Sequence, residues 1–588
     1  MSLSEVLAGR AGNLSGRLAA VFQSLVMTNP DWQTLVFGPY LPDLPSYANP
    51  GATVARNVIP AERSYKPFRT LQTVTDALES TVLGGIAAQD ASGNKYNYAG
   101  VAAKIYQVGA SGVTDKSKSG GYSTAADEVW EFTPFQNRII GTNFADPVQG
   151  LDIGAAGLFA DQFTSTLTPK ARHIATIREF LFLGNTSDAT DGAVPYRTWW
   201  SASRDPTDMD PDAQTQSDTE DRPQAGWVQR IVGGVEYGLL FQQTAITRIT
   251  YAGGETIFQF DSIDRMRGTP VPNSVIGHGR LVFFWSDEGF MSNDGTQSYP
   301  IGEDQVDSKV AAQFDVLDAS DVSAAIDPLN KIVAWRIPGV TPTIFLYNWD
   351  DQKWAEIELD VDFLINSTTE GITLEGLDAI ALDSSADTTL DANEAGGQTI
   401  ISVADETLFD VGNTVRITLN DATIHQSTID SIGTGTITIA DALPSAADSG
   451  NRCVRTSLDA LVPSLDSAQW KGGGLNFGAY STDHKLGSFD GSTLTATLET
   501  METELNPGQL SKLTKLRPLV DGGTITAAVA GRKSLQDPVV YDVAAAVDAI
   551  GEIGALNESR YHRIRVNITG TWEHAQGVQA LSSQSGEK

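Results

Sequence analysis

Histidine and carboxylate side chains could do acid–base or metal chemistry in this chain, but their spacing favours neither. The six histidines are spread along all 588 residues. We expect His562 and His574 to lie on adjacent strands, where two histidines are more often surface residues than metal ligands. The other four are His173, His278, His425 and His484.

The motifs of common catalytic sites are missing from the sequence. It contains no G-x-S-x-G turn, no H-E-x-x-H zinc motif and no P-loop. Carboxylate pairs abound because the chain is acidic, so no pair indicates glycoside hydrolysis. The acidic segment 203–226 has the carboxylate density of a calcium loop, but its prolines and its lack of glycine-centred spacing favour a solvated loop. We therefore predict no catalytic residue, no cofactor or cofactor-binding residue and no metal ligand.

The composition favours an all-β protein with many turns. The chain has 55 Gly and 25 Pro between short β-rich segments, and 41% of its residues are hydrophobic. Its length suggests two to four structural units. Several of the eleven Trp residues lie in expected strands, and we expect them to fill the space between stacked sheets.

Charge and cysteine content restrict the possible functions. The net charge is −33, from 73 acidic and 40 basic residues, so the chain should not wrap nucleic acid. The acidity has two explanations, either solubility or a surface past which DNA slides without binding. The single cysteine, Cys453, excludes an intrachain disulfide and fits synthesis in a reducing cytoplasm. No apolar segment has membrane-spanning length, and residues 1–28 do not have the pattern of a signal peptide.

The segment 278–302 shows the pattern that recurs along the chain. It reads as three strands, 281–285, 289–292 and 296–299, separated by turns that contain glycine. Such a meander cannot bury both faces alone. Similar meanders follow one another at intervals of roughly 40–50 residues, which is the spacing of four-stranded β-propeller blades. A β-sandwich is the alternative, and it explains so many short strands less well.

These patterns predict four regions. Residues 1–68 comprise an amphipathic helix at 14–28 and an extended, proline-rich arm. Residues 69–384 form the first part of a propeller, in which 109–126 and 203–226 are loops. Residues 385–455 form an inserted small β-barrel of five strands. Residues 456–588 return to the propeller and close it, with a hairpin that turns at 521–523.

Stretches throughout the chain resemble the phage tail proteins of the nozzle type, also called tail tubular protein B or packaged-DNA stabilisation proteins. The resemblance covers about 35–380 and 456–580. It is carried by PYLPDLPSYANPGATVARNVIPAERSYKPF, YAGVAAKIYQV, YRTWWSASRDPTDMD, ITYAGGETIFQFDSIDRMRGTPVPNSV, YPIGEDQV, DPLNKIVAWRIP, FLYNWDDQKWAEI, LETMETELNPGQLSKLTKLRPLVDGG and ESRYHRIRVNITGTWEHAQGV. The helix at 14–28 and the barrel at 385–455 lie outside it.

The resemblance implies a structural, non-enzymatic protein of the virion tail that is assembled in the host cytoplasm. Such proteins form a ring, usually of six copies, below the portal and adaptor. The ring extends the DNA channel, retains the packaged genome and permits its ejection. The implied partners are other copies of the chain, the portal and adaptor, tail fibre or tail tip proteins, and double-stranded DNA in passage. We expect the helix, the arm and the barrel to make ring contacts, because the meanders do not need them.

Two alternatives belong to other classes. One is a tail-associated propeller that binds or cleaves host surface carbohydrate. The other is a hub or baseplate protein of a long-tailed phage.

Overall fold

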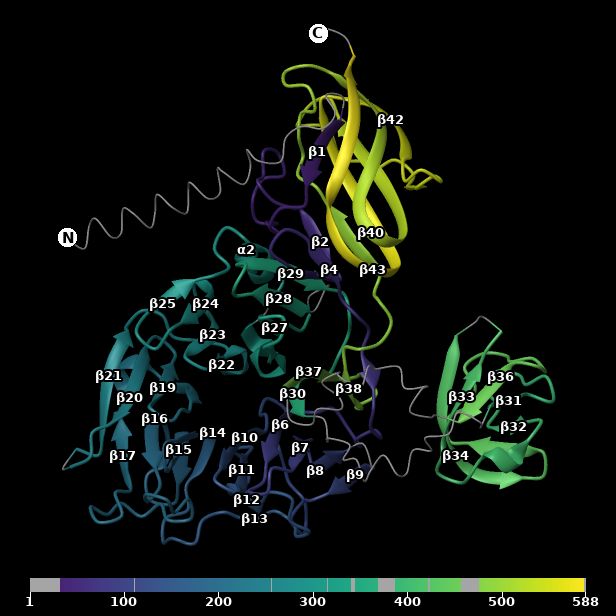
Figure 1. Cartoon of the computed structure of the whole chain (residues 1–588). Helices are drawn as coiled ribbons and strands as arrows, with labels where there is room; N and C mark the ends of the chain where they lie inside the picture. The colour runs from purple at the N-terminus through teal and green to yellow at the C-terminus, as the bar shows by residue number, and fades with distance from the viewer. Residues whose placement is uncertain are drawn as a thin grey trace. The chain divides into compact units, whose positions relative to one another are not determined.

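The computed structural model describes residues 32–109, 112–254, 256–314, 316–339, 344–368, 387–420, 423–455 and 475–585. Within them the chain is built almost entirely of β-strands (Figure 1). It divides into two compact units. The propeller unit comprises the described residues of Met1–Ser367 and Phe477–Lys588, and the barrel unit comprises those of Thr368–Asn476. The helix expected at 14–28 lies outside the described residues.

Seven four-stranded antiparallel arrays, here called blades 1 to 7, make up most of the propeller unit. Blades 1 to 3 consist of β6 (Gly84–Gln89), β7 (Lys95–Gly100), β8 (Ile105–Gly109) and β9 (Gly112–Asp115); β10 (Glu131–Phe135), β11 (Arg138–Thr142), β12 (Gln149–Asp152) and β13 (Ala160–Asp161); and β14 (Lys170–Ile177), β15 (Phe180–Asp188), β16 (Gly192–Trp200) and β17 (Asp218–Asp221). Blades 4 to 6 consist of β18 (Val228–Val232), β19 (Tyr237–Gln242), β20 (Ile246–Tyr251) and β21 (Phe258–Asp264); β22 (Ile276–His278), β23 (Leu281–Ser286), β24 (Gly289–Asn293) and β25 (Ser298–Pro300); and β26 (Ser323–Asp327), β27 (Ile332–Arg336), β28 (Ile344–Asn348) and β29 (Lys353–Ile357). Blade 7 consists of β30 (Phe363–Thr368), β37 (Leu475–Tyr480), β38 (Leu486–Ser488) and β5 (Gln72–Thr73).

The seven blades close into a ring. Apolar side chains pack between each blade and the next, and blade 7 packs in the same way on blade 1, where Ile365 meets Tyr106 and Val108. The outermost strand of blade 7 is β5, which precedes blade 1 in the sequence and pairs with β38. A strand that precedes blade 1 in the sequence thus completes blade 7, whose other strands follow blade 6. The expected β-propeller is confirmed.

The meander at 276–300 shows why the local sequence folds this way. Gly289 and Gly295 adopt φ of 110° and 85° in the turns that separate β23, β24 and β25. Such positive φ carries no steric cost for glycine. The apolar residues between the turns are buried, so the prediction of three strands in 278–302 is confirmed.

Two predicted loops contain strands. β9 lies within 109–126, and β17 lies within the acidic segment 203–226. Both are outermost strands of their blades, so they need no apolar face. Arg197 of β16 holds β17 through an ion pair with Asp221, at 2.8 Å. With β9, blade 1 has four strands.

The arm forms strands and is part of the core, where the sequence predicted only an extended, proline-rich segment; the ring contacts expected of it stay a prediction. Its strands are β1 (Trp32–Val36), β2 (Val54–Arg56), β3 (Val58–Pro60) and β4 (Tyr65–Pro67). Tyr40 and Tyr65 have no exposed surface. β2 lies between β29 of blade 6 and β39 (Ala496–Glu499), so it joins the propeller to the sheet formed by the C-terminal residues. The meanders need the arm to connect them to this sheet.

The C-terminal residues form the other end of the 13-stranded sheet that also contains blade 6 and β2, and we call this end the C-terminal sheet. With β39 it contains β40 (Ser511–Arg532), β41 (Ala545–Ala546), β42 (Ile553–Ser559) and β43 (Tyr561–Gln584). Of the residues after 456, only β37 and β38 belong to a described blade, which corrects the assignment of 456–588 to the propeller. The hairpin expected at 521–523 is also wrong. β40 continues through Gly522 and Gly523, whose positive φ produces irregular pairing with β43 in place of a turn.

The barrel unit has six described strands, one more than expected. They are β31 (Asp387–Thr389), β32 (Ile400–Ser402), β33 (Thr414–Thr418), β34 (Ile424–Gly433), β35 (Thr436–Ile439) and β36 (Arg452–Arg455). They pair in the order β31, β36, β33, β34, β35, β32, and a bridge from Leu390 to Val403 closes the barrel. Its interior is apolar and includes Cys453.

The short helices lie in connections between strands. They are η1 (Pro223–Ala225), η2 (Pro272–Ser274), α2 (Asp307–Ala311), η3 (Val316–Asp321) and η5 (Glu406–Leu408).

Candidate functional site

The joint between blade 6 and the arm contains a buried charge cluster, here called the arm joint. Glu356 of β29 is fully buried and accepts a hydrogen bond from the Tyr40 hydroxyl at 2.5 Å. Arg56 pairs with the same carboxylate at 3.0 Å, and the Lys309 ammonium pairs with it as well. Burial and the Glu356 carboxylate raise the pKa of Tyr40 well above its usual value. One carboxylate therefore links the arm, α2 and blade 6.

The arm also caps α2. The Asp43 carboxylate accepts hydrogen bonds from the backbone N–H groups of Ser308 and Lys309, at 2.7 and 2.8 Å. These are donors that a helix leaves unpaired at its first turn. Asp307 lies between Asp43 and blade 5, where its Oδ1 accepts from the N–H of Phe290 at 3.1 Å. Burial, reinforced by Asp43 and Glu303, raises the pKa of Asp307 to about 7.

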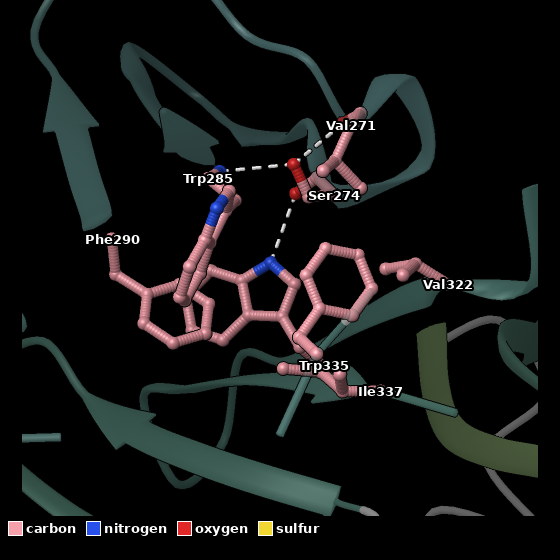
Figure 2. A pocket seen from close by; sticks show the side chains of 8 residues that line it. Val271, Ser274, Trp285, Phe290, Val322, Trp335 and Ile337 are labelled. Carbon is pink, nitrogen blue, oxygen red and sulfur yellow. Dashed lines mark hydrogen bonds between the residues drawn. The ribbon is translucent and has the colours of Figure 1, made fainter. Parts of the chain in front are cut away.

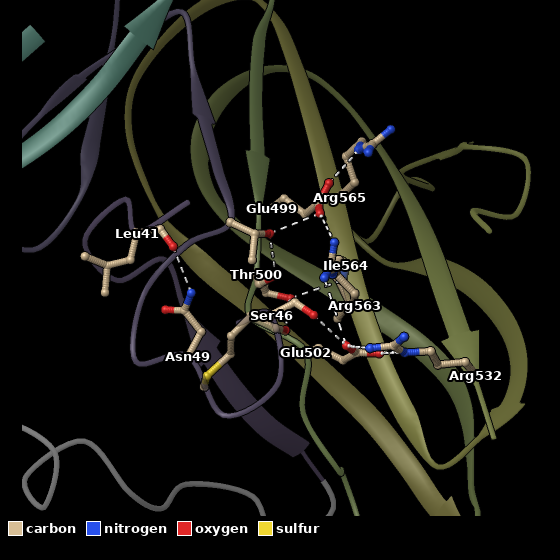
Figure 3. Close-up of polar contacts among 12 residues, drawn as sticks. Leu41, Ser46, Asn49, Glu499, Thr500, Glu502, Arg532, Arg563, Ile564 and Arg565 are labelled. Carbon is tan, nitrogen blue, oxygen red and sulfur yellow. Dashed lines mark hydrogen bonds and ion pairs between the residues drawn. The ribbon is translucent and has the colours of Figure 1, made fainter. Parts of the chain in front are cut away.

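A second cluster joins the arm to the C-terminal sheet (Figure 3). Glu499 is almost fully buried and pairs with Arg563 and Arg565 at 3.0 and 2.8 Å. It also accepts a hydrogen bond from the hydroxyl of Thr53 in the arm at 3.0 Å. We call this group, together with the neighbouring Glu502 pairs, the sheet cluster.

Glu502, three residues after Glu499, makes the same kind of connection. It pairs with Arg532 of β40 and accepts a hydrogen bond from Ser46 of the arm at 3.0 Å. Each of the two buried glutamates thus binds arginines of the C-terminal sheet and a hydroxyl of the arm. The arm contributes a neutral hydroxyl to each carboxylate, and a hydrogen bond to a charged group stabilises by about 1.5–3 kcal/mol, so these two contacts favour the docked arm.

A third cluster, here called the central cluster, joins the first strands of blades 2, 3 and 4. Glu131 is buried and accepts from His173 Nδ1 and Arg230 at 3.0 Å each, and from the N–H of Ile174 at 3.1 Å. Burial alone would raise the pKa of Glu131, but Arg230 and His173 outweigh it and hold the pKa below its usual value. A carboxylate saturated with donors is a poor proton acceptor.

A small pocket in the described residues is a packing defect in the aromatic core between blades 5 and 6 (Figure 2). It leaves a void of about 10 Å³, about the space of one water molecule. Ser274 positions two tryptophans that line this pocket. The Ser274 hydroxyl accepts a hydrogen bond from the backbone N–H of Trp285 at 2.9 Å, and the Ser274 carbonyl accepts one from the indole N–H of Trp335 at 2.9 Å. These tryptophans fill the space between sheets, as the sequence predicted.

The histidines do not form a site. His562 and His574 both lie on β43, so the expectation of adjacent strands is wrong. His562 is fully buried, and burial lowers its pKa to about 4. His484 binds the Asp362 carboxylate, and His173 belongs to the central cluster. Sequence reasoning missed the three clusters because many of their partners are 40 to several hundred residues apart, where no local pattern connects them.

The described residues include no group of three or more His, Cys, Asp or Glu side chains that could hold a metal ion. No helix in the described part of the chain is long and apolar enough to span a membrane. The chemistry that the three clusters perform is charge neutralisation between segments distant in sequence.

No protein-family model and no curated protein matches this sequence. Three solved structures are similar at low scores. Dihydro-heme d1 dehydrogenase NirN shares 10% identity over 65% of this chain and 75% of its own, with a TM-score of 0.27. Apo AztD from Citrobacter koseri shares 11% sequence identity over 67% of this chain and 97% of its own, with a TM-score of 0.23. An exo-β-1,3-galactanase from Phanerochaete chrysosporium shares 7% sequence identity over 79% of this chain and 98% of its own, with a TM-score of 0.22. Similarity at this level transfers no activity to this chain.

Proposed function

We propose that this chain is a structural protein of a bacteriophage tail, a nozzle subunit that extends the DNA channel below the portal and adaptor. It would retain the packaged genome, permit its ejection and act without catalysis. Its partners would be other copies of itself in a ring, the portal and adaptor, and tail fibre or tip proteins.

The proposal rests on one observation: stretches that resemble the nozzle proteins, although distant in sequence, meet at the arm joint and the sheet cluster. The stretch 39–68 supplies Tyr40, Ser46, Thr53 and Arg56 to the arm joint and the sheet cluster. The other main partners in these stretches are Glu356 in 345–357, Glu499 and Glu502 in 498–523, and Arg563 and Arg565 in 558–578. The resembling stretches therefore supply many of the residues that hold the propeller to the C-terminal sheet, with Lys309 and Arg532 added from outside them, which supports a structural role.

The charge is compatible with the same role. Copies of a chain with net charge −33 arranged around a channel would repel phosphates within the Debye length of about 8–10 Å. Double-stranded DNA would then slide through the channel and would not adhere to it.

Electron microscopy of the purified chain and of the virions tests the proposal. Images of the purified chain should show a ring with a central channel. Images of the virions should show density for the propeller at the tail. A chain that stays monomeric and is absent from virions would contradict it. Specific binding or cleavage of host surface polysaccharide by the isolated protein would favour the carbohydrate alternative, and location in a long-tailed baseplate would favour the hub.

A further inference from the structure

The C-terminal sheet has a face that points away from its core. At one end of the sheet four strands lie in the order β42, β40, β43, β1. Gly554, Lys515, Leu581 and Trp32 form one row across these strands. Directly paired residues point to the same side of a sheet. We call the side that these four residues share the outer face.

The next row shows that the opposite side is the core. Ile553, Leu516 and Ala580 pair across the same strands and are buried. Because side chains alternate along a strand, Leu556 of β42 and Val36 of β1 return to the outer face. They are 81% and 42% exposed.

The described residues leave much of the outer face open. A Cβ atom added to Gly554 would meet no atom within 4 Å. Two cations on this face, Lys515 and Arg517, are neutralised, since both pair with Glu552 at 2.7 Å. The Arg517 guanidinium also lies 4.6 Å from the centre of the Trp32 ring. Trp32, Leu581, Leu556 and Val36 therefore form the apolar part of a face that also carries Thr34, Gln579, Arg517 and Lys512. Exposed apolar side chains rimmed by polar residues are typical of binding surfaces.

Residues 1–31 lead directly to this face, because Trp32 is part of it. Only Asn29, Pro30 and Asp31 separate Trp32 from the segment 14–28. That segment has an apolar helical face made of Leu18, Val21, Phe22, Leu25 and Val26. An extended chain covers at most about 14 Å from Trp32 to Thr28, so the C-terminal end of the segment lies within reach of the outer face.

We propose that residues 14–28 pack as an amphipathic helix on the outer face of the same chain, against Trp32, Leu556 and Leu581. A helix of 15 residues is about 22 Å long, which matches four strands spaced about 4.8 Å apart together with their side chains. The proposal does not depend on the tail assignment. Of the two docking sites that an amphipathic helix at 14–28 could have, its own chain or a neighbouring subunit, the proposal selects its own chain.

Cysteine cross-linking in the full-length chain tests the proposal. Leu25→Cys with Leu556→Cys should form an intrachain disulfide under mild oxidation. It should form at least about tenfold faster than in Ala20→Cys with Leu556→Cys, whose helix position faces away, because proximity raises the effective concentration. Leu25→Cys with Val235→Cys is the distant control, since Val235 is 85% exposed in the propeller. The native Cys453 is fully buried and should not interfere.

A second measurement does not require disulfide geometry. Maleimide labelling of Leu556→Cys should become at least about tenfold faster when residues 1–28 are removed, because the helix would no longer cover the site. Labelling of Val235→Cys should not change. Disulfide-linked dimers would overturn the proposal in favour of docking on a second copy. Equal cross-linking rates in test and control pairs, or unchanged labelling after the deletion, would overturn it in favour of an uncovered face.

Discussion

At the scale of single residues, buried glutamates carry much of the specific chemistry of this molecule. Glu131, Glu356, Glu499 and Glu502 each bind at least one arginine or lysine while almost fully removed from water. Taking a carboxylate out of water is costly unless its partners restore the lost hydrogen bonds. Removing one partner from any of these clusters should therefore be strongly destabilising.

Replacing Glu131 should destabilise the protein strongly. In Glu131→Ala the Arg230 and His173 side chains lose their shared partner, and we expect a loss of about 3–5 kcal/mol in the free energy of unfolding. Urea unfolding followed by tryptophan fluorescence measures it. The matched control is Glu288→Ala, because Glu288 is 56% exposed in its pair with Arg267 and should cost at most about 1 kcal/mol. Similar losses in the two variants would contradict the role of the central cluster.

His562 should make the protein sensitive to acid. Its folded pKa of about 4 lies below the unfolded value of 6.5, so the unfolded chain binds a proton first as the pH falls. Stability is unaffected above pH 6.5, is lost between 6.5 and 4, and changes no further below. The full loss is about 3 kcal/mol. His562→Phe should remove this part of the pH dependence in unfolding measured at pH 7.5 and 4.5. An unchanged difference between wild type and variant across this range would show that His562 does not titrate as inferred.

At the scale of elements, the arm and α2 act as one connection. Asp43 caps α2, Lys309 extends from α2 to Glu356, and β2 pairs on both of its sides. The arm also buries apolar side chains such as Phe37, Val58 and Tyr65 in the main core, so this set of polar contacts adds to apolar packing.

The connection should respond to pH through Asp307. Its folded pKa of about 7 lies above the unfolded value of 3.8, so the folded state favours the protonated carboxyl. The stabilisation is complete below pH 3.8 and is lost as the pH rises through 7. Asp307→Asn mimics the protonated form and should raise the melting temperature at pH 8 more than at pH 5. Asp43→Asn, which weakens the cap, should lower the melting temperature instead. A destabilised Asp307→Asn at pH 8 would mean that the charged carboxylate is needed.

The barrel should be an independent element. Its strands close on themselves around a complete apolar core. A peptide of residues 385–455 should therefore unfold cooperatively alone, with Cys453 protected from thiol reagents until denaturant is added. The full chain in which a Gly/Ser linker replaces 385–455 should keep the stability of the propeller. Immediate reaction of Cys453 in the peptide would show that the barrel needs the rest of the chain.

At the scale of the whole molecule, closure of the ring depends on a two-residue strand. β5 pairs with β38 and fixes the beginning of the chain to blade 7. In this position a Cβ atom on Gly487 would lie 2.5 Å from the carbonyl oxygen of Gln72. Such an approach forces the two strands apart.

Gly487→Ala should therefore loosen the closed ring. We expect a loss of about 1–3 kcal/mol, together with faster hydrogen exchange at residues 72–75 and 486–488. Gly157→Ala is the control, because its nearest neighbour would be 3.9 Å away. Equal stability of the two variants would show that β5 is dispensable for closure.

Sequence alone determined the features that depend on neighbouring residues. Glycine-containing turns between short apolar segments predicted the meanders, and their spacing predicted blades. The alternating pattern of 398–455 predicted the barrel, although the strand at 387–389 was too short to recognise. Sequence patterns did not predict acidic outer strands such as 218–221, because the outermost strand of a blade has no apolar face to bury.

Only the tertiary structure decided the number of blades, the strand that closes the ring and the position of the arm. The turns and prolines at 38–68 and the glycines at 521–523 allow several backbone paths. Pairing partners hundreds of residues away select among them, as β39 does for β2 and β43 does for β40. The same is true of the carboxylates. Sequence shows that the chain is rich in Asp and Glu, but burial and distant arginines determine which of them hold the molecule together.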